Sequence, residues 1–260
     1  MDAAVIGGQA GGGEGSGFDC PRDGSSGTKK NDLKPWQKKQ WCLGQITGES
    51  LARMEDILEV YERPYNQRFP VVCFDEKPYQ LLQGMAQELA MKPGRAAKMD
   101  SQYRRKGTCC LLAAVEPRAG NHKVEVHRRR GKREYARFMR GLAAKYPDAE
   151  RIILIQDNLN THGPGCFYEF YPAEEARALA KRFELHFTPK KASWLNMAEI
   201  EFSVMSKQCL ARRIGSIGEL GTQLRNWEKG RNKERATISW RFTTNKARGK
   251  LQRHYEAVLN

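Results

Sequence analysis

A run of four apolar residues, 152–155, is followed after one residue by an acidic residue near the middle of the chain. Residues 151–156 (RIILIQ) show no alternation of polar and apolar side chains, which is typical of a strand buried on both faces. Asp157 and Asn158 follow at once, and His162 comes shortly after. An ionised carboxylate at the edge of an apolar layer is costly to desolvate unless a positive charge meets it. The fold must therefore bring a cation to Asp157.

Changes in hydrophobic period divide the chain into strands and helices. Three strand-like runs come first without helical patterns between them, so we expect them to pair in antiparallel fashion. Two further strands follow, each after a helical pattern. This order predicts an α/β fold with a mixed five-stranded sheet and helices on its faces. The five predicted strands cover residues 71–75, 108–115, 123–127, 151–156 and 185–188.

Composition and helical periodicity predict three segments. Residues 1–28 hold nine glycines and little hydrophobic periodicity, so we expect disorder, with a sequence that is non-native or read out of frame. Residues 29–66 contain a basic stretch with two tryptophans and then an amphipathic helix. Residues 67–260 form the main domain, and its predicted helices cover residues 135–146, 173–183, 194–213 and 217–235, followed by a short tail.

The charge of the chain points to a polyanionic partner. Lys and Arg number 45 against 30 Asp and Glu, which gives a formal net charge of +15. Basic residues are concentrated in residues 91–145 and again in residues 206–254. Binding to nucleic acid by release of counterions is the first expectation, and a solvated basic surface is the alternative.

Cysteine spacing and hydropathy indicate a cytoplasmic protein. The seven cysteines form no C-x-x-C pair, and several lie within apolar runs, so we expect reduced cysteines in the core. No apolar run approaches the roughly 20 residues of a membrane span. We therefore expect no membrane association.

Three acidic residues are candidates for one metal site. Asp75 ends the first predicted strand, Asp157 follows the fourth, and Glu199 lies on the predicted helix after the fifth. Converging carboxylates repel one another unless a cation lies between them, and oxygen ligands suit Mg²⁺ or Mn²⁺. Taken singly, each acid could equally be a helix cap or a turn residue. Spacing alone does not decide between Asp75 and Glu76, or between Glu199 and Glu201.

Three stretches together resemble a known family. The sequences VVCFDEKPYQLL, DAERIILIQDNLNTH and SWLNMAEIEF are similar to the DDE transposases of bacterial insertion sequences in the mariner superfamily, the insertion-sequence six-thirty group. The resemblance runs from about residue 29 to the C-terminal region. It implies an RNase H-like fold in which Asp75, Asp157 and Glu199 bind two divalent metal ions, Mg²⁺ or Mn²⁺. Glu76 and Glu201 then become secondary candidates.

Other polar residues have more than one interpretation. Asn158 can orient a carboxylate or a metal-bound water. His162 can lie near the scissile phosphate, relay a proton or serve as a structural histidine. Lys190 and Lys191 precede the Glu199 helix and can contact phosphate oxygens, or can simply be solvated. The basic run after the third strand, which includes Arg128, Arg129 and Arg130, can follow a DNA backbone.

The resemblance implies a function and also a departure from the family. Members cut DNA at the ends of their element, transfer the ends into target DNA at a TA dinucleotide, and pair two ends in a synaptic homodimer. We expect this activity in the bacterial cytoplasm at the nucleoid. Residues 1–28 do not resemble the helix-turn-helix modules that recognise element ends. Alternative hypotheses are therefore a catalytically silent DNA-binding or inhibitory transposase fragment, and a structure-selective nuclease.

Overall fold

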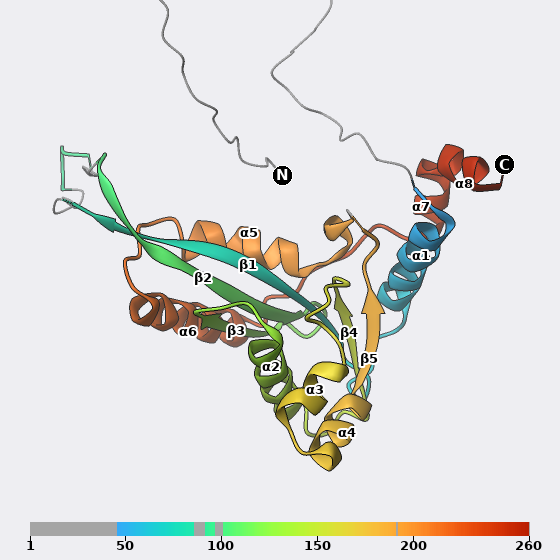
Figure 1. Ribbon diagram of the computed structural model, residues 1–260. Coiled ribbons are helices and arrows are strands. Elements are labelled where there is room, and N and C mark those ends of the chain that lie inside the picture. Colours follow the sequence, from blue (N-terminus) through green and yellow to red (C-terminus); the bar gives the residue numbers. More distant parts are fainter. Residues whose placement is uncertain (1–45, 86–91, 97–100, 191, 260) are drawn as a thin grey trace, which may run out of the picture. The chain divides into compact units, whose positions relative to one another are not determined.

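The computed structural model describes residues 46–85, 92–96, 101–190 and 192–259 (Figure 1). The predicted segment 1–28, most of the predicted basic stretch after it, and Lys191 lie outside the described residues. Residues Gln45–Asn260 form one compact unit. None of its described helices is both long and apolar enough to cross a membrane. The five cysteines in the described part of the chain are buried and unpaired.

A mixed five-stranded sheet organises this unit, as predicted. The spatial order is β3-β2-β1-β4-β5. The first three strands along the chain pair in antiparallel fashion, whereas β4 pairs in parallel with both β1 and β5. The β2–β3 turn closes at Gly120, whose positive φ of 70° suits glycine. The strands are β1 Val71–Gly84, β2 Tyr103–Glu116, β3 Asn121–His127, β4 Ile152–Gln156 and β5 Phe183–Phe187.

Helices cover both faces of the sheet. On one face, side chains of α2, α3 and α4 pack against Val72 and Phe74 of β1. On the other face, α1 and the start of α5 pack near Cys73, and the rest of α5 packs with α6 over β2. The helices are α1 Gly48–Glu62, α2 Lys132–Ala144, α3 Gly165–Phe170, α4 Ala173–Lys181, α5 Ala198–Gln208, α6 Ile217–Glu234, α7 Thr244–Lys250 and α8 Gln252–Leu259.

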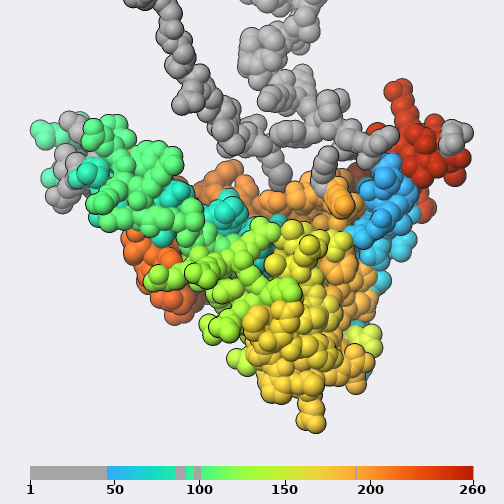
Figure 2. Space-filling model, viewed as in Figure 1, coloured from blue at the N-terminus to red at the C-terminus, as the bar shows by residue number. Residues whose placement is uncertain are grey.

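The predicted amphipathic helix forms and anchors the C-terminal helices. Helix α1 buries the apolar stripe expected from its sequence, including Ile57 and Leu58. Its polar side binds the C-terminal region: Glu55 accepts two hydrogen bonds of 2.7 Å from Arg248 and one of 2.6 Å from Tyr255. Figure 2 shows α1 in blue beside α7 and α8 in red. The predicted short tail is thus two helices held by the first one.

Strands β1 and β2 are longer than predicted, and Asp75 does not end its strand. Strand β1 continues to Gly84, and β2 begins at Tyr103 instead of Thr108. The outer halves of these strands pair only with each other, because β4 leaves β1 after Cys73. Figure 1 shows this two-stranded ribbon extending beyond β3 and β4. It buries only a few apolar side chains, such as Leu81 and Cys109, among residues that are exposed or half-buried, and so hydrophobic alternation did not reveal it.

Two predicted helices also begin and end differently. The helix predicted at 173–183 is preceded by the short helix α3, which the Gly and Pro residues before it concealed. The helix predicted at 194–213 is replaced by a 3-10 turn at Ser193–Leu195 and then α5, which ends at Gln208. Asn196 separates the two because its side chain bonds to the backbone of a strand and of α5. Tertiary contacts therefore decide where the helix that carries Glu199 begins.

Candidate active site

Asp75 and Asp157 occupy matching positions where β1 and β4 separate. The parallel register pairs Val71 with Ile153 and continues to Cys73 with Ile155. Two residues further along each segment come Asp75 and Asp157. In β1, Asp75 shares the face of Cys73, since side chains of a strand alternate with a period of two. Both carboxylates therefore follow directly from the buried parallel pair.

Glu199 approaches the two aspartates from the first turn of α5. Its side chain is exposed, and α5 packs against the β1 and β2 strands on the face of Asp75. Burial raises the pKa of Asp75 most, and the negative charges of Glu199 and Asp157 raise it further. The backbone N–H of Glu76, which donates to Asp75 at 2.8 Å, lowers it, and the resulting pKa is about 7. Asp157 and Glu199 are thus each close enough to Asp75 to repel its negative charge.

This set of side chains fits a divalent cation. All three donors are carboxylates, the oxygen ligands that Mg²⁺ and Mn²⁺ prefer. Within the described residues, no three His, Cys, Asp or Glu side chains already lie close enough to enclose an ion. A cation that draws Asp75, Asp157 and Glu199 together would relieve the repulsion seen in the raised pKa of Asp75. These are the residues that would hold it.

Glu76 lies on the opposite face of the sheet from Asp75. Strand position 75 pairs with Ala113, which packs under α5, whereas position 76 pairs with Leu112, which packs under α2. The Glu76 side chain is only 3% exposed and forms ion pairs with Arg130 and with the ring of His162. Spacing left the choice between Asp75 and Glu76 open. The strand decides it, because only Asp75 lies on the face that α5 covers.

Glu201 is likewise directed away from Glu199. Its carboxylate is 3% exposed and lies 2.6 Å from Arg231 of α6 and 3.2 Å from the buried ring of His122. Burial raises its pKa, but the hydrogen bonds from His122 and Arg231 lower it more, so the net shift is downward. Two positions along a helix turn a side chain by about 200°. Glu201 thus holds α5 to α6, and Glu199 alone faces the aspartates.

His162 is buried beside Asp157. Its Nδ1 donates a hydrogen bond of 2.6 Å to Asp157 Oδ1, and its ring stacks on Tyr135 with centroids 4.8 Å apart. Burial lowers the pKa of His162, but the hydrogen bonds to Asp157 and Glu76 raise it more, to about 9. The imidazole is therefore a cation at neutral pH. It is the positive charge of the protein that meets Asp157.

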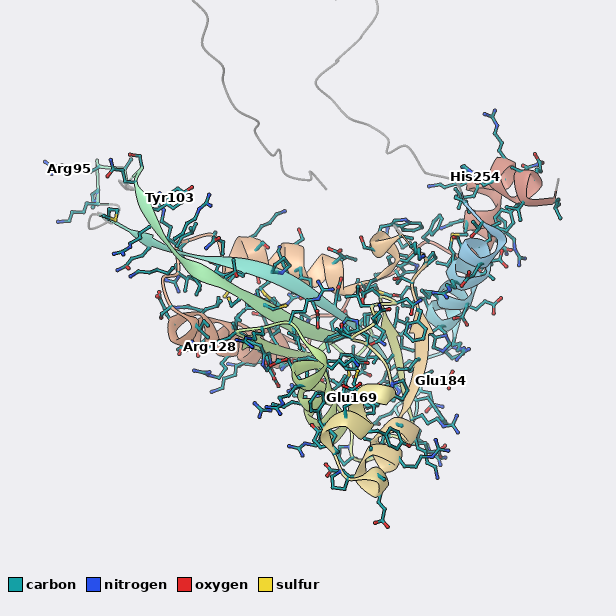
Figure 3. The ribbon with its side chains drawn as sticks, in the orientation of Figure 1. Arg95, Tyr103, Arg128, Glu169, Glu184 and His254 are labelled. Carbon is teal, nitrogen blue, oxygen red and sulfur yellow. The ribbon has the colours of Figure 1, made fainter. Side chains whose placement is uncertain are left out.

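The basic residues predicted to contact DNA differ in their surroundings. Arg128 and Arg129 are exposed on the loop between β3 and α2, where Figure 3 labels Arg128. Arg130 is on the same loop, but its guanidinium binds Glu76 at 2.7 Å. Lys190 is exposed just before the turn that leads to Glu199, and Asn158 is exposed after β4. Arg130 thus differs from Arg128 and Arg129 because its guanidinium is engaged by a buried carboxylate.

The part of the chain that carries the three carboxylates matches a known protein family. The sequence profile of the DDE superfamily endonucleases matches residues 70–221, which is more than half of the chain and contains all three carboxylates. The chain belongs to the DDE superfamily endonucleases. No sequence among curated proteins matches it. The predicted RNase H-like fold is confirmed.

Several solved structures have a fold similar to that of this chain. The Mos1 mariner paired end complex with Mn matches with a TM-score of 0.51 at 16% identity, covering 86% of this chain and 65% of that chain. The corresponding complex with Mg gives 0.54 at 16% identity, covering 89% and 68%. The Mos1 paired-end complex with left transposon end gives 0.53 at 15% identity. The DDE endonuclease described here thus spans about two thirds of the Mos1 chain.

Asn196 is a positioning residue that sequence reasoning missed. Its Nδ2 donates a hydrogen bond of 2.8 Å to the Phe74 carbonyl, and its Oδ1 accepts one of 3.1 Å from the Ala198 N–H. The first bond satisfies a β1 carbonyl just past the residue where β4 leaves the strand, and the second caps α5. Asn196 thereby joins the backbone next to Asp75 to the helix of Glu199. An Asn just before a helical pattern was the available signal.

Replacing Asn196 with Ala is expected to destabilise this DDE endonuclease by about 1–3 kcal/mol, because the buried Phe74 carbonyl loses its donor. Urea unfolding at pH 7 measures the change. Asn158→Ala is the matched control, since Asn158 is exposed and its loss should change the unfolding free energy by less than about 0.5 kcal/mol. Equal stability of the Asn196 variant and the wild type would contradict the anchoring role.

Proposed function

We propose that this chain is the catalytic domain of a DNA transposase, which cuts DNA strands at the ends of its element and transfers them into target DNA. The observation that supports the proposal most is that Asp157 and Glu199 both lie close enough to the half-buried Asp75 to raise its pKa, at the point where β1 and β4 separate. Membership of the DDE superfamily endonucleases supports cleavage of DNA. The net charge of +15 supports binding of the phosphate backbone.

The side chains of the chain have separate tasks in this proposal. With its pKa raised to about 7, Asp75 is only partly ionised near neutral pH, and its protonated fraction would release the proton when the carboxylate binds a cation. His162 holds Oδ1 of Asp157 by a hydrogen bond of 2.6 Å. Glu199, exposed on the first turn of α5, supplies the third carboxylate. Two bound Mg²⁺ or Mn²⁺ ions would lower the pKa of the attacking water or 3′ hydroxyl and stabilise charge on the phosphate.

Exposed basic residues complete the proposed DNA contact. Arg128, Arg129 and Lys190 are exposed, so that they can bind phosphate oxygens without breaking a buried ion pair. Lys191 is assigned the same task from sequence alone. The proposed partners are element ends and target DNA, held by a homodimer in a synaptic complex; Mos1 has been solved in paired-end complexes with DNA. We place this activity in the bacterial cytoplasm at the nucleoid.

Nicking of supercoiled DNA tests the proposal. With Mg²⁺ or Mn²⁺ added, the wild-type chain is expected to convert supercoiled plasmid to open circles. Asp157→Ala should reduce this to background while keeping salt-sensitive DNA binding. Salt-sensitive binding without cleavage in either protein would favour a silent DNA-binding fragment. Equal cleavage by both proteins would exclude this site.

A further inference from the structure

A row of alternating charges connects an arginine on the β3–α2 loop to Asp157. Arg130 Nε lies 2.7 Å from Glu76 Oε2, and Glu76 Oε1 lies 3.1 Å from His162 Nε2. His162 Nδ1 in turn lies 2.6 Å from Asp157 Oδ1. We call these four residues the Arg130–Asp157 bridge. Cation and anion alternate along it, so that each inner charge has a partner on both sides.

The inner members of the bridge are withdrawn from water. The His162 side chain is fully buried, and Glu76 is 3% exposed. A buried polar side chain that loses its partner is left unpaired in the interior, so the contacts of His162 with Glu76 and Asp157 hold all three side chains in place. Arg130, at 44% exposure, closes the row at the protein surface. The bridge therefore needs all its charges to be stable as a unit.

Packing prevents the His162 ring from turning away. The ring stacks on Tyr135 at an interplanar angle of 21° and meets the edge of Phe74 at a centroid distance of 5.3 Å. Tyr135 is itself fixed, because its hydroxyl donates a hydrogen bond of 2.9 Å to Gln156, the residue before Asp157. A ring held by stacking on one side and by an edge contact on another transmits its orientation to the carboxylate it binds.

We propose that Glu76, His162 and Arg130 are positioning residues that set the orientation of the Asp157 carboxylate. This inference rests on the proposed function, in which Asp157 binds a cation. Partners of a ligating side chain commonly set its orientation and affinity. Arg130 accordingly acts on Asp157 indirectly, through Glu76 and His162. Arg128 and Arg129 remain proposed DNA contacts.

Two measurements separate positioning from DNA binding. Calorimetric titration of the full chain with Mn²⁺ reports the carboxylate site without any turnover, and the salt dependence of DNA binding reports phosphate contacts. Glu76→Gln should weaken Mn²⁺ binding by about tenfold or more. It should also lower kcat for nicking while KM for DNA is unchanged. Asp157→Ala gives the lower limit of Mn²⁺ binding.

Glu76 is buried, so Glu76→Gln could weaken Mn²⁺ binding through a folding defect. Arg130→Gln is a second test of the same bridge at a partly exposed residue, where a folding defect is not expected. It should weaken Mn²⁺ binding in the same direction by a smaller factor and leave the salt slope unchanged, and Arg130→Lys should restore most of the affinity. Arg129→Gln is the matched control from the same loop. It should leave Mn²⁺ binding unchanged and reduce the salt slope by about 0.9.

The opposite pattern would overturn the inference. If Arg130→Gln reduces the salt slope as Arg129→Gln does and leaves Mn²⁺ binding at the wild-type level, Arg130 is a phosphate contact. If the wild type binds Mn²⁺ and nicks DNA but the Glu76 and Arg130 variants match it, only the positioning role fails. If the wild type itself neither binds Mn²⁺ nor nicks DNA, the proposed function fails, and this inference fails with it.

Discussion

Glu199→Gln is expected to reduce metal-dependent DNA nicking by about two to three orders of magnitude while the chain remains folded. The substitution keeps the size of the side chain but removes one of the three negative charges that would hold a cation. Glu199 is exposed and adds a charge that repels Asp75, so its loss should not destabilise the fold. Plasmid nicking and urea unfolding of the same preparation measure the two effects.

Glu201→Gln, two residues away on the same helix, is the matched control. It leaves Arg231 and the buried His122 without their carboxylate partner, so we expect a loss of unfolding free energy of about 3 kcal/mol. Nicking per folded molecule should remain near that of the wild type at a temperature where both are folded. The assignment of Glu199 would be wrong if the two variants exchanged these phenotypes.

Asp75→Asn is expected to abolish nicking and yet to stabilise the metal-free chain at pH 8, by about 2 kcal/mol. The wild-type carboxyl lies half-buried next to Glu199 and Asp157, and folding brings these negative charges together. Asn has the same shape without the charge, so it avoids the cost of burying a carboxylate, which is the larger cause of the raised pKa, and also the repulsion. Urea unfolding of both proteins in the presence of a chelator measures the difference, and nicking assays measure the loss of activity.

The sign of its pH dependence follows from the direction of the pKa shift. The pKa of Asp75 rises from its ordinary 3.8 to about 7 in the folded chain. Between these values the folded chain keeps a proton that the unfolded chain has released, so wild-type stability falls as pH rises through this window. The advantage of the Asp75→Asn variant over the wild type should therefore be absent near pH 4, grow up to about pH 7 and stay constant above it. A constant advantage across this range would contradict the raised pKa.

Local patterns predicted the elements whose stability comes from burying their own apolar face. The run at residues 151–156 became the fully buried strand β4, and the stripe of Leu51 to Tyr61 became helix α1. The same patterns did not reveal the outer halves of β1 and β2, which are held by pairing with each other and bury only a few apolar side chains, Leu81 and Cys109 among them. Periodicity reports burial, and a two-stranded ribbon that is mostly polar gives a weak signal.

The sequence names the candidate carboxylates, but residue spacing alone does not decide between neighbouring acids. Asp75 and Glu76 are adjacent acids, and only the sheet register assigns Asp75 to the α5 face and Glu76 to the α2 face. The roles of all three carboxylates stay predictions until the variants are measured. His162 illustrates the same limit. Its sequence context allowed a structural or a catalytic role, and the structure shows a buried imidazole ring between the carboxylates of Glu76 and Asp157.

The sequence by itself determined the sheet, the faces of its main helices and the chemical character of the site, because apolar periodicity and acidic side chains are properties of the chain. Only the tertiary structure decided which acids meet and which are neutralised by buried cations. Glu76 and Glu201 are bound by Arg130 and Arg231, which lie 54 and 30 positions further along the chain. Such pairings depend on how distant elements pack, and a carboxylate takes its role from the charges that packing brings to it.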